Sequence, residues 1–590
     1  MSTELNEQLG TSTVVWDLDD LYLTASDELI VDDIGFCEQE AVQLNKEFSG
    51  RLAELKSEDF VSVVKRLERI AQSLGRMSTF AFLNFSTQIE NEEAGAFLQQ
   101  IREAASRIDR ECIFFELEWS KMDEEVAVKL LAAKGTALYQ HHLEKIRRYA
   151  AHQMSQVEES LIIEFKPVGA AAWTNLCTKV MANLRFGTDK RSEEEVLSEL
   201  YSPEREVRRQ AAKDLTDGLR SQLHILTHIF NTLLANKMID DRLRVYPSWV
   251  SSRNLDNELA EDTVAALIAA TTSRYDIVQR YYTLKKELLH IDKLKDYDRY
   301  APLPNLPEKL ICWQECKEIV VDGFNAFSPQ MAEIADLFFE RNWIHAPLME
   351  GKRGGAFAHP AVPDAHPYIL VNYTGNLRDV STVAHELGHG IHQYLAKDKG
   401  YYNSDTPLVL AETASVFAEL LIFHRQLDLL GDAGQKRAFV CQKLESIFAT
   451  VFRQISMNRF EDGVHTTRRN DGELSAARFS EIWLESQGEM FGDSVELTED
   501  YGIWWSYIPH FLHSPGYVYS YAFGELLVLA LYNLYKKQGD SFVPKYLHLL
   551  AQGGSVSPYE LLKPFDINLN DADFWQSGLS LIDGILAEVV

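Results

Sequence analysis

The stretch DVSTVAHELGHGIHQYL, residues 379–395, decides the architecture that we expect around the functional site. Asn376 and Asp379 predict a capped helix start, because each side chain can accept a hydrogen bond from the other residue's backbone N–H. Gly400 predicts the helix end, since glycine readily adopts the left-handed conformation that stops a helix. We therefore expect one continuous helix over 376–399.

Two histidines of this helix lie on one face. Each residue of an α-helix turns the chain by about 100°, so His389 lies about 40° from His385 and one turn farther along. Both imidazoles can therefore reach one metal ion. Glu386 lies on the flank of that face, within reach of a water molecule that the metal activates, without binding the metal itself. The pattern His-Glu-x-x-His is typical of zinc metalloproteases.

A third ligand is needed, because catalytic zinc takes three protein ligands and leaves one position open. A second helix is expected over 407–430, and it contains Glu412, which follows His389 by 412 − 389 = 23 residues. An antiparallel neighbouring helix can return this carboxylate to the two imidazoles. We therefore predict that His385, His389 and Glu412 bind one Zn²⁺ ion per chain. Glu419, about 20° away from Glu412 on its helix, is predicted to bond to a ligating imidazole and fix its tautomer.

A strand candidate precedes the first helix. The run PYILVNY, at 367–373, is rich in β-branched and aromatic residues. GKRGG, at 351–355, predicts a flexible loop that can serve as a lid or as a simple connector. A strand edge near the metal can pair with an extended peptide, so Tyr368, Leu370 and Asn372 are predicted substrate contacts. An ordinary buried strand is the alternative.

Composition predicts that the chain is mainly α-helical. Only 31 Gly and 17 Pro occur in 590 residues, so helices are seldom interrupted. Lys293 to Pro307, a polar stretch that contains prolines, predicts a connector.

The chain has 58 Lys+Arg and 88 Asp+Glu, which gives a net charge of −30. This balance argues against nucleic acid or a membrane as the partner.

Cysteine usage and the N-terminal sequence indicate a cytoplasmic protein. Six cysteines are too few for a disulfide framework and are expected as reduced core thiols. The opening residues, MSTELNEQLGTSTVVW, have neither the basic start nor the apolar core of a secretory signal. No uncharged apolar stretch reaches the roughly 18 residues that a membrane span requires.

Several segments together resemble the M3 family of zinc oligopeptidases, the thimet oligopeptidase-like metallopeptidases, and most closely its oligoendopeptidase F branch. These segments are the HELGH helix, AETAS at 411–415, PYILVNY, HFLHSPGYVYSYAFGE at 510–525, and, less sharply, WDLDDLY at 16–22 and the helical region 111–184. The resemblance implies a large two-lobed helical clamshell with a deep channel and a small β-sheet beside the zinc-binding helix. It also implies an N-terminal helical region over 1–110, an oligopeptidase F-like helical domain over 111–190 and a catalytic region over 191–590.

The family pattern places a histidine before tyrosines that contact the substrate and the transition state. By spacing, His510 matches this histidine better than His513 does. Tyr521 and Tyr517 would share a helix face, and with His510 they are predicted to act in catalysis. Tyr519 would point away from them and is predicted to contact the substrate. An aromatic core patch is the alternative for each of these residues.

Metal-assisted hydrolysis of peptide bonds is the reaction that these residues predict. Zinc would polarise the scissile carbonyl, and Glu386 would accept the proton of the attacking water and pass it to the leaving amine. The resemblance implies short peptides as substrates, because a deep channel excludes folded proteins. A helical zinc carboxypeptidase or dipeptidase, with Arg353 or Arg378 to capture a free terminus, is one alternative. A catalytically silent peptide-binding relative is the other. Cobalt or manganese would also suit these ligands, and the oligomeric state stays open.

Overall fold

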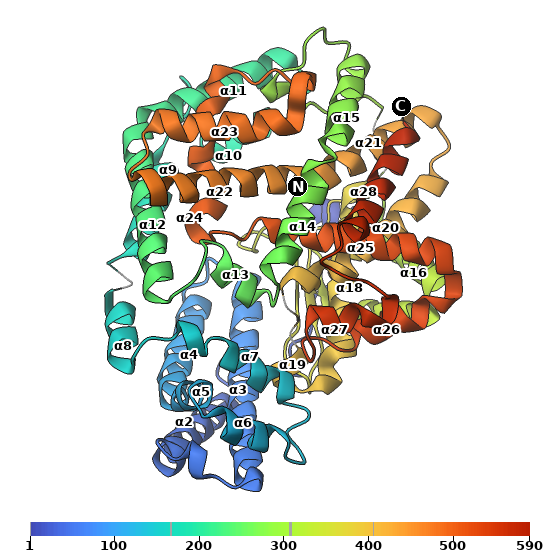
Figure 1. The fold of residues 1–590 in the computed structure, drawn as a ribbon. Coiled ribbons are helices and arrows are strands. Elements are labelled where there is room, and N and C mark those ends of the chain that lie inside the picture. The colour runs from blue at the N-terminus through green and yellow to red at the C-terminus, as the bar shows by residue number, and fades with distance from the viewer. Residues whose placement is uncertain (1, 166–167, 306–309, 405, 407, 590) are drawn as a thin grey trace. The chain divides into compact units, whose positions relative to one another are not determined.

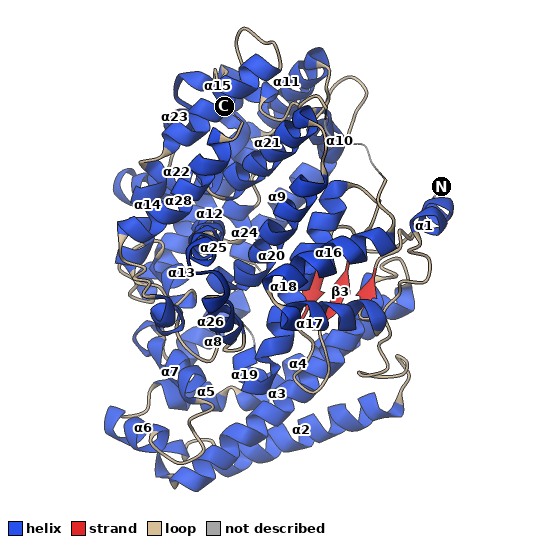
Figure 2. Ribbon diagram, turned by 90° about the vertical axis from the view of Figure 1, so that its right-hand side faces the viewer, coloured by secondary structure: helices blue, strands red, loops and turns tan. Residues whose placement is uncertain are grey.

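The structure, a computed structural model, describes residues 2–165, 168–305, 310–404, 406 and 408–589. It is mainly α-helical, as predicted, and its strands form a small three-stranded sheet (Figures 1 and 2). Within the described residues, no helix combines the length and the apolar composition that crossing a membrane requires. All six cysteines are free.

The chain forms two compact units, each built from separate stretches. Unit 1 contains Met1–Ala150, Glu308–Leu429 and Leu534–Ile567, and unit 2 contains Ala151–Pro307, Leu430–Asn533 and Asn568–Val590. The expected connector over 293–307 ends where one unit gives way to the other, although its last two residues lie outside the described residues. The division into 1–110, 111–190 and 191–590 stays a prediction, as does the clamshell arrangement.

The helices of unit 1 surround the sheet and extend into an N-terminal bundle. They are α1 (Ser2–Leu9), α2 (Glu28–Phe48), α3 (Ser57–Ser86), α4 (Glu92–Cys112), α5 (Phe114–Ser120), α6 (Glu124–Leu131), α7 (Gln140–Arg148), α16 (Trp313–Phe327), α17 (Pro329–Glu340), α18 (Leu377–Ala396), α19 (Tyr401–Ser404), α20 (Leu408–Leu429), α26 (Val543–Leu550) and α27 (Pro558–Leu562). The apolar faces of α2, α3 and α4 supply much of the core of the bundle.

The helices of unit 2 pack around an aromatic core. They are α8 (Gln156–Phe165), α9 (Ala170–Asn183), α10 (Glu193–Glu199), α11 (Arg205–Ser221), α12 (Leu223–Leu243), α13 (Ser251–Asp256), α14 (Glu261–Thr272), α15 (Tyr275–Leu288), α21 (Ala433–Thr450), α22 (Phe452–Asp471), α23 (Ala476–Phe491), α24 (His510–His513), α25 (Tyr519–Gln538), whose last residues belong to unit 1, and α28 (Ala572–Ala587). Trp483, Trp504 and Trp505 are among the fully buried side chains of this core.

The sheet has the strand order β1-β3-β2 and lies beside α16, α17 and α18 (Figure 2). Its strands are β1 (Ile344–His345), β2 (Phe357–His359) and β3 (Tyr368–Leu370). β1 runs parallel to β3, and β2 runs antiparallel to it. The predicted strand at 367–373 is confirmed as the shorter β3, but β3 is the central strand. The predicted free edge at this segment is therefore wrong, and the edge strands are β1 and β2.

The two helices expected around the site are both present. α18 begins with the predicted reciprocal cap, in which the backbone N–H of Asp379 donates to the Asn376 side chain over 3.0 Å. A 3₁₀ turn over Lys397–Lys399 follows α18, and Gly400 then turns the chain away with φ 80°. α20 covers the second predicted helix and packs along α18. Local capping thus fixes where α18 starts and ends.

Candidate active site

Three side-chain atoms of α18 and α20 converge on one point. His385 Nε2 and His389 Nε2 lie 3.2 Å apart. Glu412 Oε2 lies 3.4 Å from His385 Nε2 and 3.5 Å from His389 Nε2. Among the residues that the structure describes, these three form the only cluster of His, Cys, Asp or Glu that could hold a metal ion.

The spacing of these atoms fits a tetrahedral zinc site. Ligand atoms that bind zinc tetrahedrally at about 2.0–2.1 Å lie about 3.3–3.4 Å from one another. The three measured separations of 3.2, 3.4 and 3.5 Å match this value. Two imidazole nitrogens and one carboxylate oxygen also form a donor set that catalytic zinc uses, and they leave the fourth corner open.

Glu419 orients one of the imidazoles. Its Oε1 lies 2.6 Å from His385 Nδ1. A carboxylate accepts this hydrogen bond, so Nδ1 carries a proton and Nε2 is the nitrogen that faces the cluster. Carboxylates commonly hold metal-ligating histidines in this way. The predicted pairing of Glu419 with a cluster imidazole is therefore present in the structure.

Charge is concentrated at the cluster. Burial alone would raise the pKa of Glu412, but His389, His385 and the Ser415 hydroxyl, 2.7 Å from Oε2, lower this pKa to about 2. Burial would lower the pKa of His385, but Glu419 and Glu412 raise it to about 9. The two carboxylates thus stabilise positive charge at this point, and a bound cation would replace the proton that they hold on His385.

Glu386 is buried beside the cluster, with 6% of its surface exposed. Burial raises the pKa of its carboxyl group, and this effect outweighs the lowering by His385 and His389. Glu412 and Glu419 raise the same pKa further. Glu386 does not contribute one of the three converging atoms. A carboxylate with these properties is a better proton acceptor than an exposed one.

Close contact between α18 and α20 depends on Gly388. A Cβ atom at this position would lie 2.6 Å from the backbone oxygen of Ala414 and 2.6 Å from Ser415 Cα. The two backbones can approach this closely only because residue 388 has no side chain. The same contact brings the backbone that carries Glu412 up to the two histidines.

The strand residues predicted to bind substrate are mostly buried. Tyr368 and Leu370 are fully buried in the central strand, so the prediction that they contact a peptide is wrong. Asn372 is half-buried, and its side-chain amide donates to the backbone oxygens of Arg353, over 2.9 Å, and Gly355, over 2.8 Å. Asn372 therefore holds the loop over 351–355 in place. The contact of Asn372 with substrate stays a prediction.

The predicted aromatic residues of unit 2 gather around His510. His510 Nε2 lies 3.2 Å from the Tyr521 hydroxyl oxygen. The ring centroids of Tyr517 and Tyr521 are 4.9 Å apart, with the rings nearly perpendicular. Burial, followed by the charges of Arg453 and His513, lowers the pKa of His510, so its imidazole is neutral at pH 7. His513 is exposed.

Tyr519 does not join the group around His510 but packs inside unit 2. It is fully buried, and its hydroxyl group donates to Asn254 Oδ1 over 2.8 Å. The same hydroxyl oxygen accepts from Asn257 Nδ2 over 2.9 Å. Because both hydrogen-bonding roles of the hydroxyl are occupied within unit 2, the prediction that Tyr519 contacts substrate is wrong.

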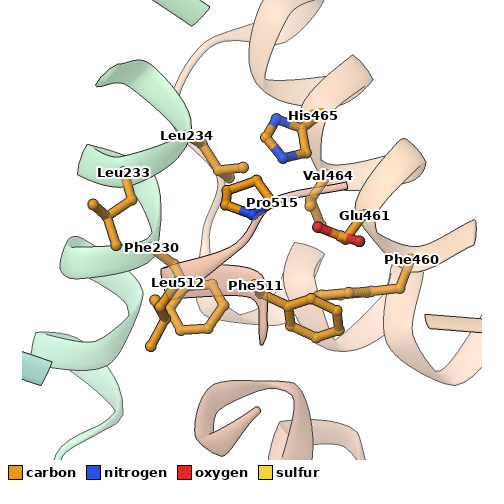
Figure 3. A pocket seen from close by; sticks show the side chains of 10 residues that line it. All are labelled: Phe230, Leu233, Leu234, Phe460, Glu461, Val464, His465, Phe511, Leu512 and Pro515. Carbon is orange, nitrogen blue, oxygen red and sulfur yellow. The ribbon is translucent and has the colours of Figure 1, made fainter. Parts of the chain in front are cut away.

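A buried carboxyl group lies beneath the Pro515–Gly516 turn, and sequence reasoning missed it. The backbone N–H of Gly516 donates to Glu461 Oε1 over 2.9 Å. Glu461 Oε2 is buried and has no hydrogen-bond partner among the described residues. Glu461 lines a small, largely apolar cavity of about 20 Å³ (Figure 3). Its lining consists of Phe230, Leu233, Leu234, Phe460, Glu461, Val464, His465, Phe511, Leu512 and Pro515. The one signal in the sequence is an acidic residue between the core positions Phe460 and Val464.

Replacing Glu461 with Gln should flatten the pH dependence of stability. Burial raises the pKa of Glu461 to about 8, so the folded protein keeps a proton that the unfolded chain releases above the ordinary carboxyl pKa. The stability of the wild type therefore falls as pH rises from about 4.5 to 8, by about 1 kcal/mol per pH unit from this group. Gln is always neutral and can still accept from Gly516.

Thermal unfolding at pH 5, 6.5 and 8 measures this difference. The advantage of Glu461→Gln over the wild type should grow across the series. Glu473→Gln, at an exposed position of the same unit, serves as the control and should show no such trend. Equal pH slopes for Glu461→Gln and the wild type would contradict the prediction.

Comparison with known proteins finds similarity along most of the chain. The profile of Peptidase family M3 matches residues 198–581, and that of Oligopeptidase F matches residues 118–186. Oligopeptidase PepF of Bacillus subtilis (strain 168) is 25% identical in an alignment of 594 positions that covers 97% of this chain and 86% of the relative.

Solved structures share the fold. A crystal structure from Chlamydophila abortus has a TM-score of 0.85 and 24% identity over 98% of each chain. Oligoendopeptidase-F from Enterococcus faecium has a TM-score of 0.72 and 20% identity, over 96% of this chain and 99% of that one. The resemblance inferred from the motifs is confirmed. Since the family profile matches most of the chain, this protein belongs to peptidase family M3, in its oligopeptidase F branch.

Proposed function

We propose that this peptidase is a zinc-dependent metalloendopeptidase that hydrolyses internal bonds of short peptides. The convergence of His385, His389 and Glu412 is the observation that carries the proposal. The family supports peptide substrates, and the names of relatives such as oligoendopeptidase F support cleavage inside oligopeptides. One zinc ion per chain and a cytoplasmic location are parts of the same proposal.

Each residue of the candidate site has a separate role in the proposed reaction. A zinc ion held by His385, His389 and Glu412 would polarise the scissile carbonyl and lower the pKa of a water molecule. Glu386 accepts the proton of the attacking water and delivers it to the leaving amine. Glu419 keeps the Nε2 lone pair of His385 directed at the ion. His510, Tyr521 and Tyr517 are the proposed hydrogen-bonding groups for the transition state, a role that the family resemblance implies.

The outer edge of β2 is the proposed site of backbone recognition. In the described part of the chain, no backbone group pairs with this edge, and β2 packs against α18. An extended peptide can add to such an edge through main-chain hydrogen bonds, which demand little of its sequence. The peptide would then run beside the helix that carries the two histidines.

A zinc carboxypeptidase is the second candidate, because Arg353 lies next to β2. Its guanidinium carbon is 5.8 Å from the centre of the Phe357 ring and 5.5 Å from that of Phe82. A cation at the end of an edge strand could capture a terminal carboxylate. Cleavage of a peptide blocked at both ends supports the endopeptidase, and cleavage of free peptides alone supports the carboxypeptidase.

Metal analysis of purified variants tests the ligand set. The wild type should contain close to one zinc ion per chain. Glu412→Ala should lose most of it, because two imidazoles alone bind zinc far more weakly. Glu419→Gln should keep the ligands but weaken zinc binding by about 10- to 100-fold, as second-sphere changes do. Unchanged zinc content in Glu412→Ala would remove Glu412 from the ligand set.

A further inference from the structure

A second cavity in unit 1 has no part in the chemistry proposed above. It has a volume of about 560 Å³ and lies among α3, α4, α7, α19 and the loop that follows β2. Buried Leu98 and Ile101 of α4 contribute to its lining. His359, the last residue of β2, contributes as well. The cavity is therefore adjacent to the edge strand to which we assign peptide binding.

The two faces of the sheet have different neighbours. Phe357 and His359 of β2 point toward α3, because their rings lie 5.4 and 5.5 Å from the ring of Phe82. Ala358 points the other way, since its cross-strand partner Ile369 faces α18. The Cδ1 atom of Ile369 lies 3.3 Å from where a Cβ of Gly390 would be. One face of the sheet thus meets the histidine helix, and the other meets α3 and the cavity.

A peptide paired with β2 must follow the same alternation. Successive side chains of a strand point to opposite faces, and residues opposite each other share a face. The peptide residue opposite His359 would therefore direct its side chain toward α3. We infer that this cavity is a specificity site that receives one side chain of the bound peptide and prefers large aromatic residues. The inference rests on the proposed function, because it needs a peptide on β2.

Planar surfaces and apolar side chains suit an aromatic ligand. The rings of His142 and Tyr402 stack with centroids 4.1 Å apart and 6° between their planes. Phe82 adds a third ring to the lining. Burial lowers the pKa values of His142 and His359 to about 4, so both imidazoles are neutral at pH 7. Neutral rings pack against an aromatic side chain without a charge to desolvate.

The charge of the cavity disfavours a basic side chain. Arg102 is exposed at its rim, and none of the residues that line the cavity, all in the described part of the chain, is acidic. The imidazole of His359 accepts the backbone N–H of Ala361 at Nδ1, over 3.1 Å, so its proton is on Nε2. The guanidinium group of Arg102 and Nε2 of His359 are thus both hydrogen-bond donors. A lysine side chain of the peptide would therefore meet a guanidinium and find no carboxylate.

A peptide series that differs at one position tests the site. Each position of a short peptide is varied in turn as Phe, Ala or Lys, and binding to the Glu386→Gln chain and cleavage by the wild type are measured. One position should show about a 10- to 100-fold preference for Phe over Ala, the expected effect of burying an aromatic side chain. Lys at this position should be the poorest of the three.

Two variants connect this preference to the cavity. Ser78→Phe fills the space from α3 and should reduce the Phe-to-Ala ratio at least tenfold, with the Ala peptide unaffected. Ser62→Phe makes the same change at an exposed position of α3 and should leave the ratio unchanged. Arg102→Glu, at an exposed position, should raise the Lys-to-Phe ratio about tenfold even if Ser78→Phe folds poorly.

The outcomes separate the two proposals. If the binding preference is absent, or is the same in all three variants, the cavity is not a specificity site. If the wild type cleaves none of the peptides, the proposed function fails, and the binding ratios still decide whether the cavity selects the side chain. A preference for Lys over Phe would overturn the assignment of the ligand class.

Discussion

Replacing Glu386 with Gln should slow peptide hydrolysis by about 10²- to 10⁴-fold, the usual contribution of a general base. Gln has nearly the same shape as Glu but cannot accept the proton of the attacking water. Only 6% of the surface of Glu386 is exposed. This burial raises the pKa of its carboxyl group, which strengthens the carboxylate as a base. The zinc content should stay unchanged, because the three converging atoms belong to His385, His389 and Glu412.

The assay for this variant should use a quenched fluorescent peptide that is blocked at both ends. Such a substrate reports endopeptidase activity alone, so the wild-type rate also tests the carboxypeptidase alternative. Glu333→Gln, an exposed position on α17 of the same unit, is the matched control and should keep the wild-type rate. Near-normal turnover by Glu386→Gln would exclude Glu386 as the base. Loss of zinc from this variant would instead make Glu386 a ligand.

The part of the site that lies on α18 could be predicted because its signals are local. The cap formed by Asn376 and Asp379 fixes the helix start, and helical rotation alone then places His385 and His389 on one face. Predicting Glu412 takes one further step, the assumption that the next helix packs back along the first. The structure agrees with that assumption, because Glu412 Oε2 lies 3.4 Å from His385 Nε2 and 3.5 Å from His389 Nε2.

The positions that sequence reasoning missed depend on pairings between distant segments. β1 and β2 contain two and three residues, too few for any periodic pattern, so nothing indicated that they flank β3 on both sides. The hydroxyl group of Tyr519 is occupied by Asn254 and Asn257, which are more than 260 residues away. The bond between Glu461 and Gly516 also joins separate elements. Residue type and spacing do not encode such contacts, because tertiary packing creates them.

Replacing Gly388 with Ala should weaken zinc binding at least tenfold and destabilise the protein. The new methyl carbon would lie 2.6 Å from two backbone atoms of α20, at Ala414 and Ser415. Backbone cannot rotate away as a side chain can, so the helices must separate, and Glu412 moves with its helix. Overpacking of this kind costs about 1–3 kcal/mol. The better helix propensity of Ala returns at most about 1 kcal/mol, so the clash decides the sign.

Gly35→Ala provides the matched control for this substitution. Gly35 lies within α2 of the same unit, and a Cβ there would have no heavy atom within 4 Å. This variant gains the propensity term without the clash, and it should be slightly more stable than the wild type with unchanged zinc affinity. Thermal unfolding of both zinc-free variants and competition with a chromophoric chelator give the two quantities. If Gly388→Ala resembles Gly35→Ala in both, the close approach of α18 and α20 does not set the geometry of the ligands. Weaker zinc binding in Gly388→Ala alone would show that the close approach of the two helices at residue 388 helps to place Glu412 beside the two histidines.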